Sequence, residues 1–296
     1  MSSRQDDGIQ EQDVRFNAVF IAFMYLKPYD GGTEVIKILT MFNQSIVFEQ
    51  PVNELLRVCI RIEHLLSTAE ESFRSPSEHG TRACIHVISN LLALTDRHDL
   101  RGKFTKEFIR QQSNLQRFLN EAGVDQNKLQ MALDELEAAI ELLQGQNGKF
   151  ANNLRENEFL SSVRQHIAMP GGGLSFDVPA FYFWLQQPFK ERREQLTAWL
   201  EEFDDMIQVT QFMLRLVRQS GQAVHHTAIE GFFQASLDPQ MPCQLIRVAV
   251  PNTIAVFPEL SVGRHGVSIR FYYPSVAGRA TPYEKDVPFR LICCVM

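Results

Sequence analysis

The sequence has few cysteines and no long apolar run. Five cysteines lie scattered along 296 residues, and a chain of this length can build a hydrophobic core without disulfide cross-links. An odd and scattered set predicts reduced thiols and a cytoplasmic protein. The longest apolar stretch, Phe16 to Leu26, is shorter than the roughly 20 residues that span a bilayer and follows acidic residues. We therefore expect neither a membrane span nor a standard secretory signal.

Positive charge is also in deficit. The 29 Lys and Arg residues against 35 Asp and Glu residues give a formal net charge of −6, so the chain as a whole does not attract nucleic acid or an anionic membrane. Only residues 226–296 are slightly basic, with 6 basic and 5 acidic side chains. Tyr272-Tyr273 is the one obvious base-stacking pair there, which leaves nucleic-acid binding as a weak alternative. We expect no nucleic-acid partner and no membrane partner.

Motifs for catalysis, cofactors and metals are missing. No Gly-x-Ser-x-Gly nucleophile motif occurs. Gly171-Gly172-Gly173 could cradle a phosphate, but it lacks a following Lys-Ser/Thr and comes after a helical pattern, which favours a hinge. His225-His226 and Cys293-Cys294 lack zinc-ligand spacing, because adjacent residues of a strand point to opposite faces. We predict a non-enzyme without cofactor or metal; the alternative is a small-ligand or nucleotide-binding enzyme that uses the Gly171–Gly173 loop.

Hydrophobic periodicity divides the chain into two parts. From about residue 54 to 220 apolar residues recur at helical spacing, and after 226 they alternate or form short runs. The sequence predicts an α+β fold, with an N-terminal helical bundle domain over 41–225 and a small C-terminal antiparallel β-domain over 226–296. Residues 1–40 are expected to be a weakly ordered extension or to result from a misassigned start.

Several elements can be placed from these patterns. The first helix is expected over residues 55–73 and the last, a long one, over 188–219; Asp125 is expected to cap the helix that follows it. Strands are expected around residues 246–250, 254–257, 267–271 and 289–293. Apolar residues spaced alternately four and three apart could form a coiled-coil dimer seam, but the core of a helical bundle has the same pattern and is favoured.

Basic residues gather at two places in this acidic chain. The second helix is expected roughly from Arg82 to Leu94, and Arg97 and Arg101 lie at the polar corner after it. Arg264, His265 and Arg270 lie on a strand pair whose other face is apolar. A single exposed arginine is ordinary. A cluster, however, fits a site for an acidic or mixed-charge peptide, because complementary charge steers and registers a partner.

An ordered series of short strings extends over residues 44–294. In order they are Phe48-Glu49-Gln50-Pro51-Val52-Asn53-Glu54, Ile60-Arg61-Ile62-Glu63, Arg110-Gln111-Gln112, Gly123-Val124-Asp125-Gln126, Pro170-Gly171-Gly172, Ser175-Phe176-Asp177, Trp184-Leu185, Arg218-Gln219-Ser220, Gly231-Phe232 and Ile269-Arg270-Phe271. Together they resemble the ZapD family of bacterial cell-division proteins.

The resemblance implies a cytoplasmic, non-enzymatic homodimer that binds the tubulin-like protein FtsZ and bundles its filaments in the Z-ring at midcell. It implies that basic residues bind the C-terminal tail of FtsZ, with Arg97 and Arg270 at matching positions and Arg61 in the best-matched string. Glu158 and Tyr182 depart from the family pattern and are given no role. The residues expected to bind the partner are therefore Arg97, Arg101, Arg270, Arg264, His265 and Arg61.

Overall fold

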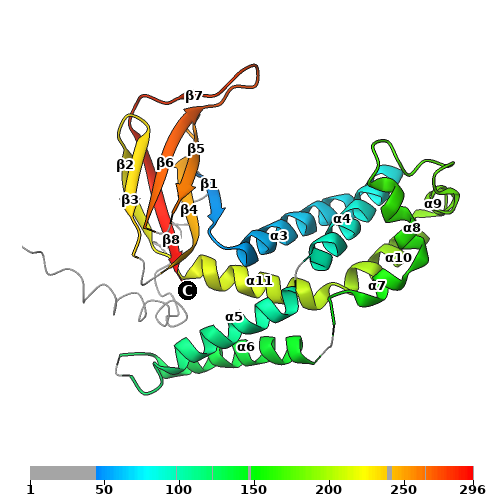
Figure 1. Ribbon diagram of the computed structural model, residues 1–296, viewed down its shortest axis with the longest axis horizontal. Helices are drawn as coiled ribbons and strands as arrows, with labels where there is room; N and C mark the ends of the chain where they lie inside the picture. Colours follow the sequence, from blue (N-terminus) through cyan, green and yellow to red (C-terminus); the bar gives the residue numbers. More distant parts are fainter. Residues whose placement is uncertain are drawn as a thin grey trace, which may run out of the picture. The chain divides into compact units, whose positions relative to one another are not determined.

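The computed structural model describes residues 45–97, 99–121, 123–145, 148–238, 242–263 and 265–295. This part of the chain begins with a strand, continues through helices and ends in antiparallel strands (Figure 1), which confirms the α+β class. The extension expected over residues 1–40 lies outside the described residues. The helices are α3 (Glu54–Phe73), α4 (Glu78–Arg97), α5 (Leu100–Gln116), α6 (Gln126–Gln144), α7 (Asn152–Glu156), α8 (Glu158–Ile167), α9 (Pro179–Leu185), α10 (Phe189–Glu201) and α11 (Asp204–Gln219). The strands are β1 (Ser45–Pro51), β2 (Ala223–Ala228), β3 (Phe232–Ser236), β4 (Cys243–Pro251), β5 (Phe257–Val262), β6 (Gly266–Tyr273), β7 (Thr281–Pro282) and β8 (Val287–Val295).

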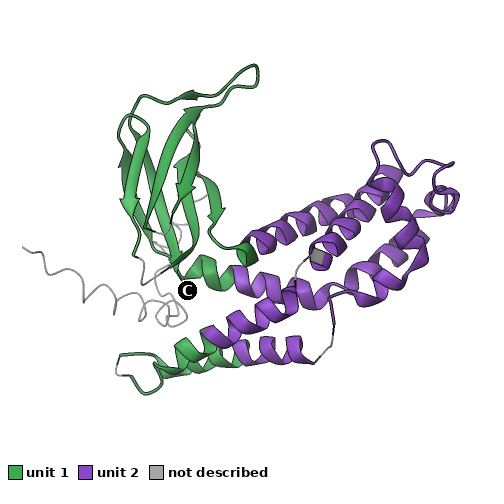
Figure 2. Ribbon diagram, viewed as in Figure 1, with its two compact units in different colours: residues 1–56, 111–135, 215–296 green, residues 57–110, 136–214 purple. Residues whose placement is uncertain are grey.

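The chain divides into two compact units, shown in different colours in Figure 2. Unit 1 comprises Met1–Leu56, Gln111–Glu135 and Arg215–Met296, and unit 2 comprises Arg57–Arg110 and Leu136–Leu214. The strands of the described residues belong to unit 1, and unit 2 is helical. Helices α3, α5, α6 and α11 each contain residues of both units.

The strands of unit 1 form a β-sandwich. One sheet has the order β1-β4-β8-β2, and in the other β6 lies between β3 and β5 and also pairs with β7. Alternate residues of these strands face a shared core, in which Phe271 of β6 and Phe289 of β8 bring their ring centroids to 5.5 Å across the two sheets. Burying such side chains contributes roughly 2 kcal/mol each, which is what holds the sheets face to face.

Polar side chains mark where the helices begin. Asn53 accepts a hydrogen bond from the amide of Leu56 at 2.8 Å at the start of α3. Asp125 accepts from the amide of Asn127 at 3.1 Å at the start of α6, which confirms the predicted cap. These side chains satisfy amides that have no partner within the helix.

The core of unit 2 combines aliphatic and aromatic side chains. Helix α4 packs against α8 and α10. Phe159 of α8 contacts Phe181 and Trp184 of α9 and Trp199 of α10, with ring centroids between 5.7 and 6.3 Å apart. These geometries are the offset and edge-on pairings that aromatic rings prefer, so the short helix α9 is held by its rings.

The structure differs from the sequence expectations in several elements. Residues 45–51, grouped by the sequence with the helical domain, form β1 and pair with β4 about 200 residues downstream. The expected helix 188–219 is interrupted at residues 202–203, where Phe203 is fully buried and Asp204 and Asp205 begin α11; acidic side chains favour a helix N-terminus. The strand expected at 254–257 lies later, as β5, and helix α9 was not anticipated.

Candidate functional site

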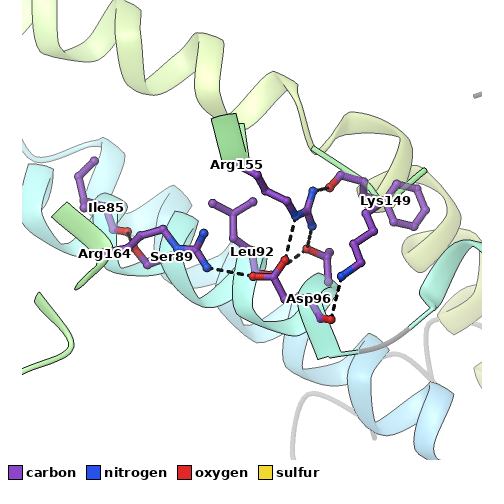
Figure 3. A network of polar contacts seen from close by, with 9 residues as sticks. Ile85, Ser89, Leu92, Asp96, Lys149, Arg155 and Arg164 are labelled. Atoms are coloured by element: carbon purple, nitrogen blue, oxygen red, sulfur yellow. Dashed lines mark hydrogen bonds and ion pairs between the residues drawn. The ribbon is translucent and has the colours of Figure 1, made fainter. Parts of the chain in front are cut away.

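The polar corner between α4 and α5 is organised by Asp96, in the last turn of α4 (Figure 3). Its Oδ1 accepts a hydrogen bond from Nε of Arg155 at 2.8 Å, and its Oδ2 accepts one from Arg164 at 3.1 Å. The Lys149 ammonium donates to the Asp96 carbonyl oxygen at 3.0 Å. Arg155 also donates to the Thr95 hydroxyl at 2.5 Å. Side chains of α7, α8 and the preceding loop therefore fix the end of α4.

The two arginines of this network lower the pKa of Asp96. Burial raises the pKa of the Asp96 carboxyl, but hydrogen bonds and charge from Arg155 and Arg164 outweigh this effect and hold the pKa below its usual value. The Asp96 carboxylate is therefore fully engaged by Arg155 and Arg164. Its role is to fix the end of α4 and, with it, the backbone of the next residue, Arg97. Arg97 ends α4, and its side chain lies outside the part of the chain that the structure describes.

Arg101, the second basic residue of the corner, is engaged inside unit 2. Its Nε donates to the Gly148 carbonyl and its Nη1 to the Leu143 carbonyl, both at 3.2 Å, and its Cζ lies 4.2 Å from the centroid of the Phe150 ring. Leu143 belongs to the last turn of α6, whose carbonyls have no partner within the helix. Burial lowers the pKa of Arg101, against a smaller opposing effect of Asp205. Arg101 therefore ties α5 to the end of α6 and the loop after it.

Arg61 borders a groove between α3 and α4. The groove measures about 540 Å³ and is lined by Ile60, Arg61, His64, Leu65, Asn90, Ala93 and Leu94. Arg61 and His64 are exposed, whereas the apolar lining residues are partly buried. Arg97 follows Ala93 by four residues, one helical turn, so the backbone of Arg97 continues the α4 side of the groove toward the corner.

Arg270 stands on the solvent face of β6. It is exposed, its neighbours Ile269 and Phe271 are fully buried, and its Cζ lies 4.9 Å from the ring centroid of Phe232, its partner on β3. Glu259 is its partner on β5. Phe232 is 38% exposed, so a guanidinium over an aromatic ring faces solvent here.

The remaining predicted residues lie near the start of β6. The side chain of His265 is exposed, and its carbonyl accepts a hydrogen bond from the amide of Leu237 at 3.0 Å. Arg264 lies outside the described residues. The structure thus places Arg61, Arg97 and Arg101 on unit 2 and His265 and Arg270 on unit 1. Sequence reasoning missed Phe232, although its Gly231-Phe232 string carried part of the resemblance, and Asp96, whose arginine partners lie about 60 residues away.

The glycine run forms a tight turn after α8. Gly171 and Gly173 have φ values of 72° and 81°, which glycine adopts without strain. The amide of Gly172 donates to the Met169 carbonyl at 2.9 Å. A Cβ at Gly172 would lie 1.9 Å from the His166 carbonyl oxygen. Glycine is therefore required here by the close approach of the backbone.

The described residues lack the features of a metal site and of a membrane span. Among them, no three His, Cys, Asp or Glu side chains lie together as a metal site would require. No helix within the described ranges has the length and hydropathy needed to cross a bilayer.

Comparison with known proteins identifies the family. The family model described as "ZapD: Cell division protein" matches residues 60–270. A cell division protein ZapD of Coxiella burnetii is 34% identical over 256 residues, covering 86% of this chain and 99% of the relative. Its counterpart in Methylococcus capsulatus is 34% identical with 86% and 100% coverage, and that of Chromobacterium violaceum is 33% identical with 84% and 99% coverage. The chain therefore belongs to the ZapD family of cell division proteins.

Proposed function

We propose that this chain is a non-enzymatic cross-linker of FtsZ filaments. It binds the C-terminal tail of FtsZ through basic residues, and as a homodimer it holds two filaments together in the cytoplasmic division ring at midcell. The family membership supports the role in cell division, and the residues described above support the mode of binding.

The observation that carries the proposal is the groove between α3 and α4. Arg61 and His64 stand at its edge over partly buried aliphatic side chains, so a bound peptide can place apolar side chains in the groove and acidic ones beside the cations. This combination suits a short peptide of mixed character, since apolar burial provides affinity and charge provides orientation. Arg97, at the end of α4, lies one helical turn beyond Ala93, which lines the α4 side of the groove.

The exposed pair of Arg270 and Phe232 offers a second set of contacts for such a peptide. A guanidinium already placed over a ring loses little conformational freedom when it binds a carboxylate. Glu259, beside Arg270 on β5, disfavours a purely acidic segment there. The tail bound at this surface is therefore expected to carry both signs of charge.

Bundling also requires that one object hold two filaments. A two-fold dimer duplicates every binding surface without an internal repeat. Two weak contacts on one dimer then bind more tightly than either alone, because the second forms at a high effective concentration. Because the contacts are exposed and charged, bundling should weaken as salt rises and shortens the screening length below about 8 Å.

Sedimentation of FtsZ filaments tests the proposal. With GTP present, the wild-type chain should increase the pelleted fraction of FtsZ and should not do so with FtsZ that lacks its tail. Arg61→Glu and Arg270→Glu should each weaken tail binding about tenfold, the effect of losing roughly 1.4 kcal/mol of charge interaction. Thermal melts and sedimentation velocity would verify that both variants remain folded and dimeric.

Matched charge reversals elsewhere provide the controls. Arg74, whose side chain is 75% exposed and pairs with Glu70, lies just beyond the end of α3, and Arg279 is exposed in the segment before β7. Arg74→Glu and Arg279→Glu change the net charge equally and should leave pelleting at the wild-type level. If all four variants reduced pelleting alike, net charge rather than these surfaces would determine binding. If wild-type chain left FtsZ sedimentation unchanged, the proposed function would be wrong.

A further inference from the structure

Two cysteines lie on neighbouring strands of the β-sandwich of unit 1. Strands β4 and β8 are antiparallel neighbours, with Cys243 opposite Val295 and Cys293 opposite Ile246, and the register shifts between Cys243 and Leu245. Cys243 belongs to the buried core between the sheets, and Cys293 packs against that core, so both thiols lie on the inner face of one sheet. The Cys243 thiol donates to the Leu245 carbonyl oxygen at 3.4 Å, so it leans along β4 toward Ile246, the residue opposite Cys293.

The two thiols lie close enough to shift each other's pKa, and they differ in character. A hydrogen bond from the Cys243 thiol lowers the pKa of Cys293, whereas the same contact and burial raise the pKa of Cys243. Cys293 is partly exposed and Cys243 is buried. Cys293 is thus a partly exposed residue whose lowered thiol pKa favours the thiolate, and Cys243 is a buried thiol beside it.

The neighbouring Cys294 provides an internal contrast. It is fully buried outside that core, and burial raises its pKa to about 12, with smaller effects of Arg247 and Glu49. Consecutive residues of a strand face opposite sides of the sheet, so Cys294 is directed away from Cys243. Its thiol is therefore unsuited to the same reaction.

We propose that Cys243 and Cys293 are an oxidation site, at which a peroxide converts the pair into a disulfide that joins β4 to β8. The Cys293 thiolate attacks one oxygen of hydrogen peroxide, the O–O bond breaks, and the released hydroxide takes up a proton to leave as water. This yields a sulfenic acid on Cys293. The Cys243 sulfur then attacks the Cys293 sulfur, the S–S bond forms, the S–O bond breaks, and the hydroxyl leaves as a second water with the proton of Cys243. The two thiols lose two electrons and two protons in all, and the peroxide is reduced to two waters.

The cross-link has a structural consequence for unit 1. Disulfide formation brings the sulfurs from hydrogen-bond contact to about 2.05 Å and closes a loop that contains β5, β6 and β7. Closing a loop of this length restricts the unfolded chain. The oxidised form should therefore unfold at a higher temperature than the reduced form. This inference does not depend on the proposed binding of FtsZ.

Thiol counting and peptide mapping test the proposal on the full-length chain. After treatment with a few equivalents of hydrogen peroxide and alkylation under denaturing conditions, the number of free thiols should fall from five to three, and dithiothreitol should restore it. The mass before alkylation should fall by two hydrogen atoms. A tryptic digest should join the peptide that holds Cys243 to the C-terminal peptide over residues 291–296.

Serine variants identify the sulfur used, because Cys293 and Cys294 share that tryptic peptide. Cys294→Ser, the matched control, should still form the cross-link. Cys293→Ser should abolish it, and Cys243→Ser should leave a sulfenic acid on Cys293 that dimedone traps. Circular dichroism before oxidation confirms that each variant is folded. A cross-link that persists in Cys293→Ser, a link between chains only, or five free thiols after peroxide treatment would each overturn the proposal.

Discussion

Replacing Asp96 by alanine removes the carboxylate that joins the end of α4 to α7 and α8. Two charged hydrogen bonds are lost, from Arg155 and Arg164. A fully buried bond of this kind contributes about 1.5–3 kcal/mol. The Asp96 side chain is 38% exposed, and screening by solvent reduces these contributions. An anion in the last turn of a helix also costs about 0.3–1 kcal/mol, which alanine would relieve. The net loss should be about 1–2 kcal/mol.

Thermal unfolding measures this loss. For a unit of this size, 1–2 kcal/mol corresponds to a melting temperature lower by roughly 2–8 °C. Asp134→Ala is the matched control, because Asp134 is exposed and accepts its hydrogen bond from the exposed Gln130; it should change the melting temperature by less than about 2 °C, as surface substitutions usually do.

The pH dependence follows from the direction of the pKa shift. The folded-state pKa of Asp96 lies below its ordinary value of 3.8, so the carboxylate contributes stability above the unfolded-state pKa, and this contribution is lost as pH falls through the folded-state pKa. The difference between wild type and Asp96→Ala should be full at pH 7 and shrink below about pH 4. A difference that stayed constant between pH 7 and pH 3 would contradict the charge-based reasoning.

A double-mutant cycle isolates the ion pair. Arg164 is the better partner for the cycle, because Arg155 also binds Thr95 and its removal would change more than one contact. The coupling between Asp96→Ala and Arg164→Ala should be about 0.5–1 kcal/mol. A coupling indistinguishable from zero would refute the view that this pair holds the corner.

Other predictions concern stability. Glu49→Ala removes a carboxylate that is only 16% exposed and that lies 2.7 Å from Arg218 and 2.8 Å from Arg247; urea unfolding should show a loss of about 2–4 kcal/mol, and a loss below 1 kcal/mol would mean that the Glu49 carboxylate does not stabilise the fold through its two arginines. Arg101→Ala should cost about 1 kcal/mol through lost contacts with α6 and the following loop, with faster hydrogen exchange there; unchanged exchange would argue against that role. Phe271→Ala should cost about 3–5 kcal/mol by leaving a cavity between the sheets, whereas a change within 1 kcal/mol would mean that the core collapses around it.

Much of the secondary structure could be predicted because it is encoded locally. The spacing of apolar residues located α3 and the strands β4, β6 and β8, and the cap at Asp125 formed as its position indicated. The sequence does not predict helix α9 because the helix has only seven residues, too few to show a helical period. Its aromatic rings are held by packing on Phe159 of α8. Strand β1 was missed because its hydrogen bonds come from β4.

The sequence named Arg61 among the expected partner-binding residues, and that role stays a prediction. The structure adds the groove that Arg61 borders, formed by α3 and α4. The difference between Arg101, held by the carbonyls of Leu143 and Gly148, and Arg270, exposed over its ring, could not be predicted. In the sequence, Arg101 and Arg270 are both simply basic residues, and nothing near either one shows whether its side chain has partners.

The sequence by itself determined the fold class, the positions of several helices and the membership of the family, because these depend on side-chain spacing and on order along the chain. Only the tertiary structure decided which charges are occupied and which face solvent, and which cysteine lies near Cys293. The reason is physical: the groups near a given guanidinium, carboxylate or thiol come from elements some 40 to 170 residues away. Whether these groups come into contact depends on how the elements pack, which the spacing of residues along the chain does not reveal.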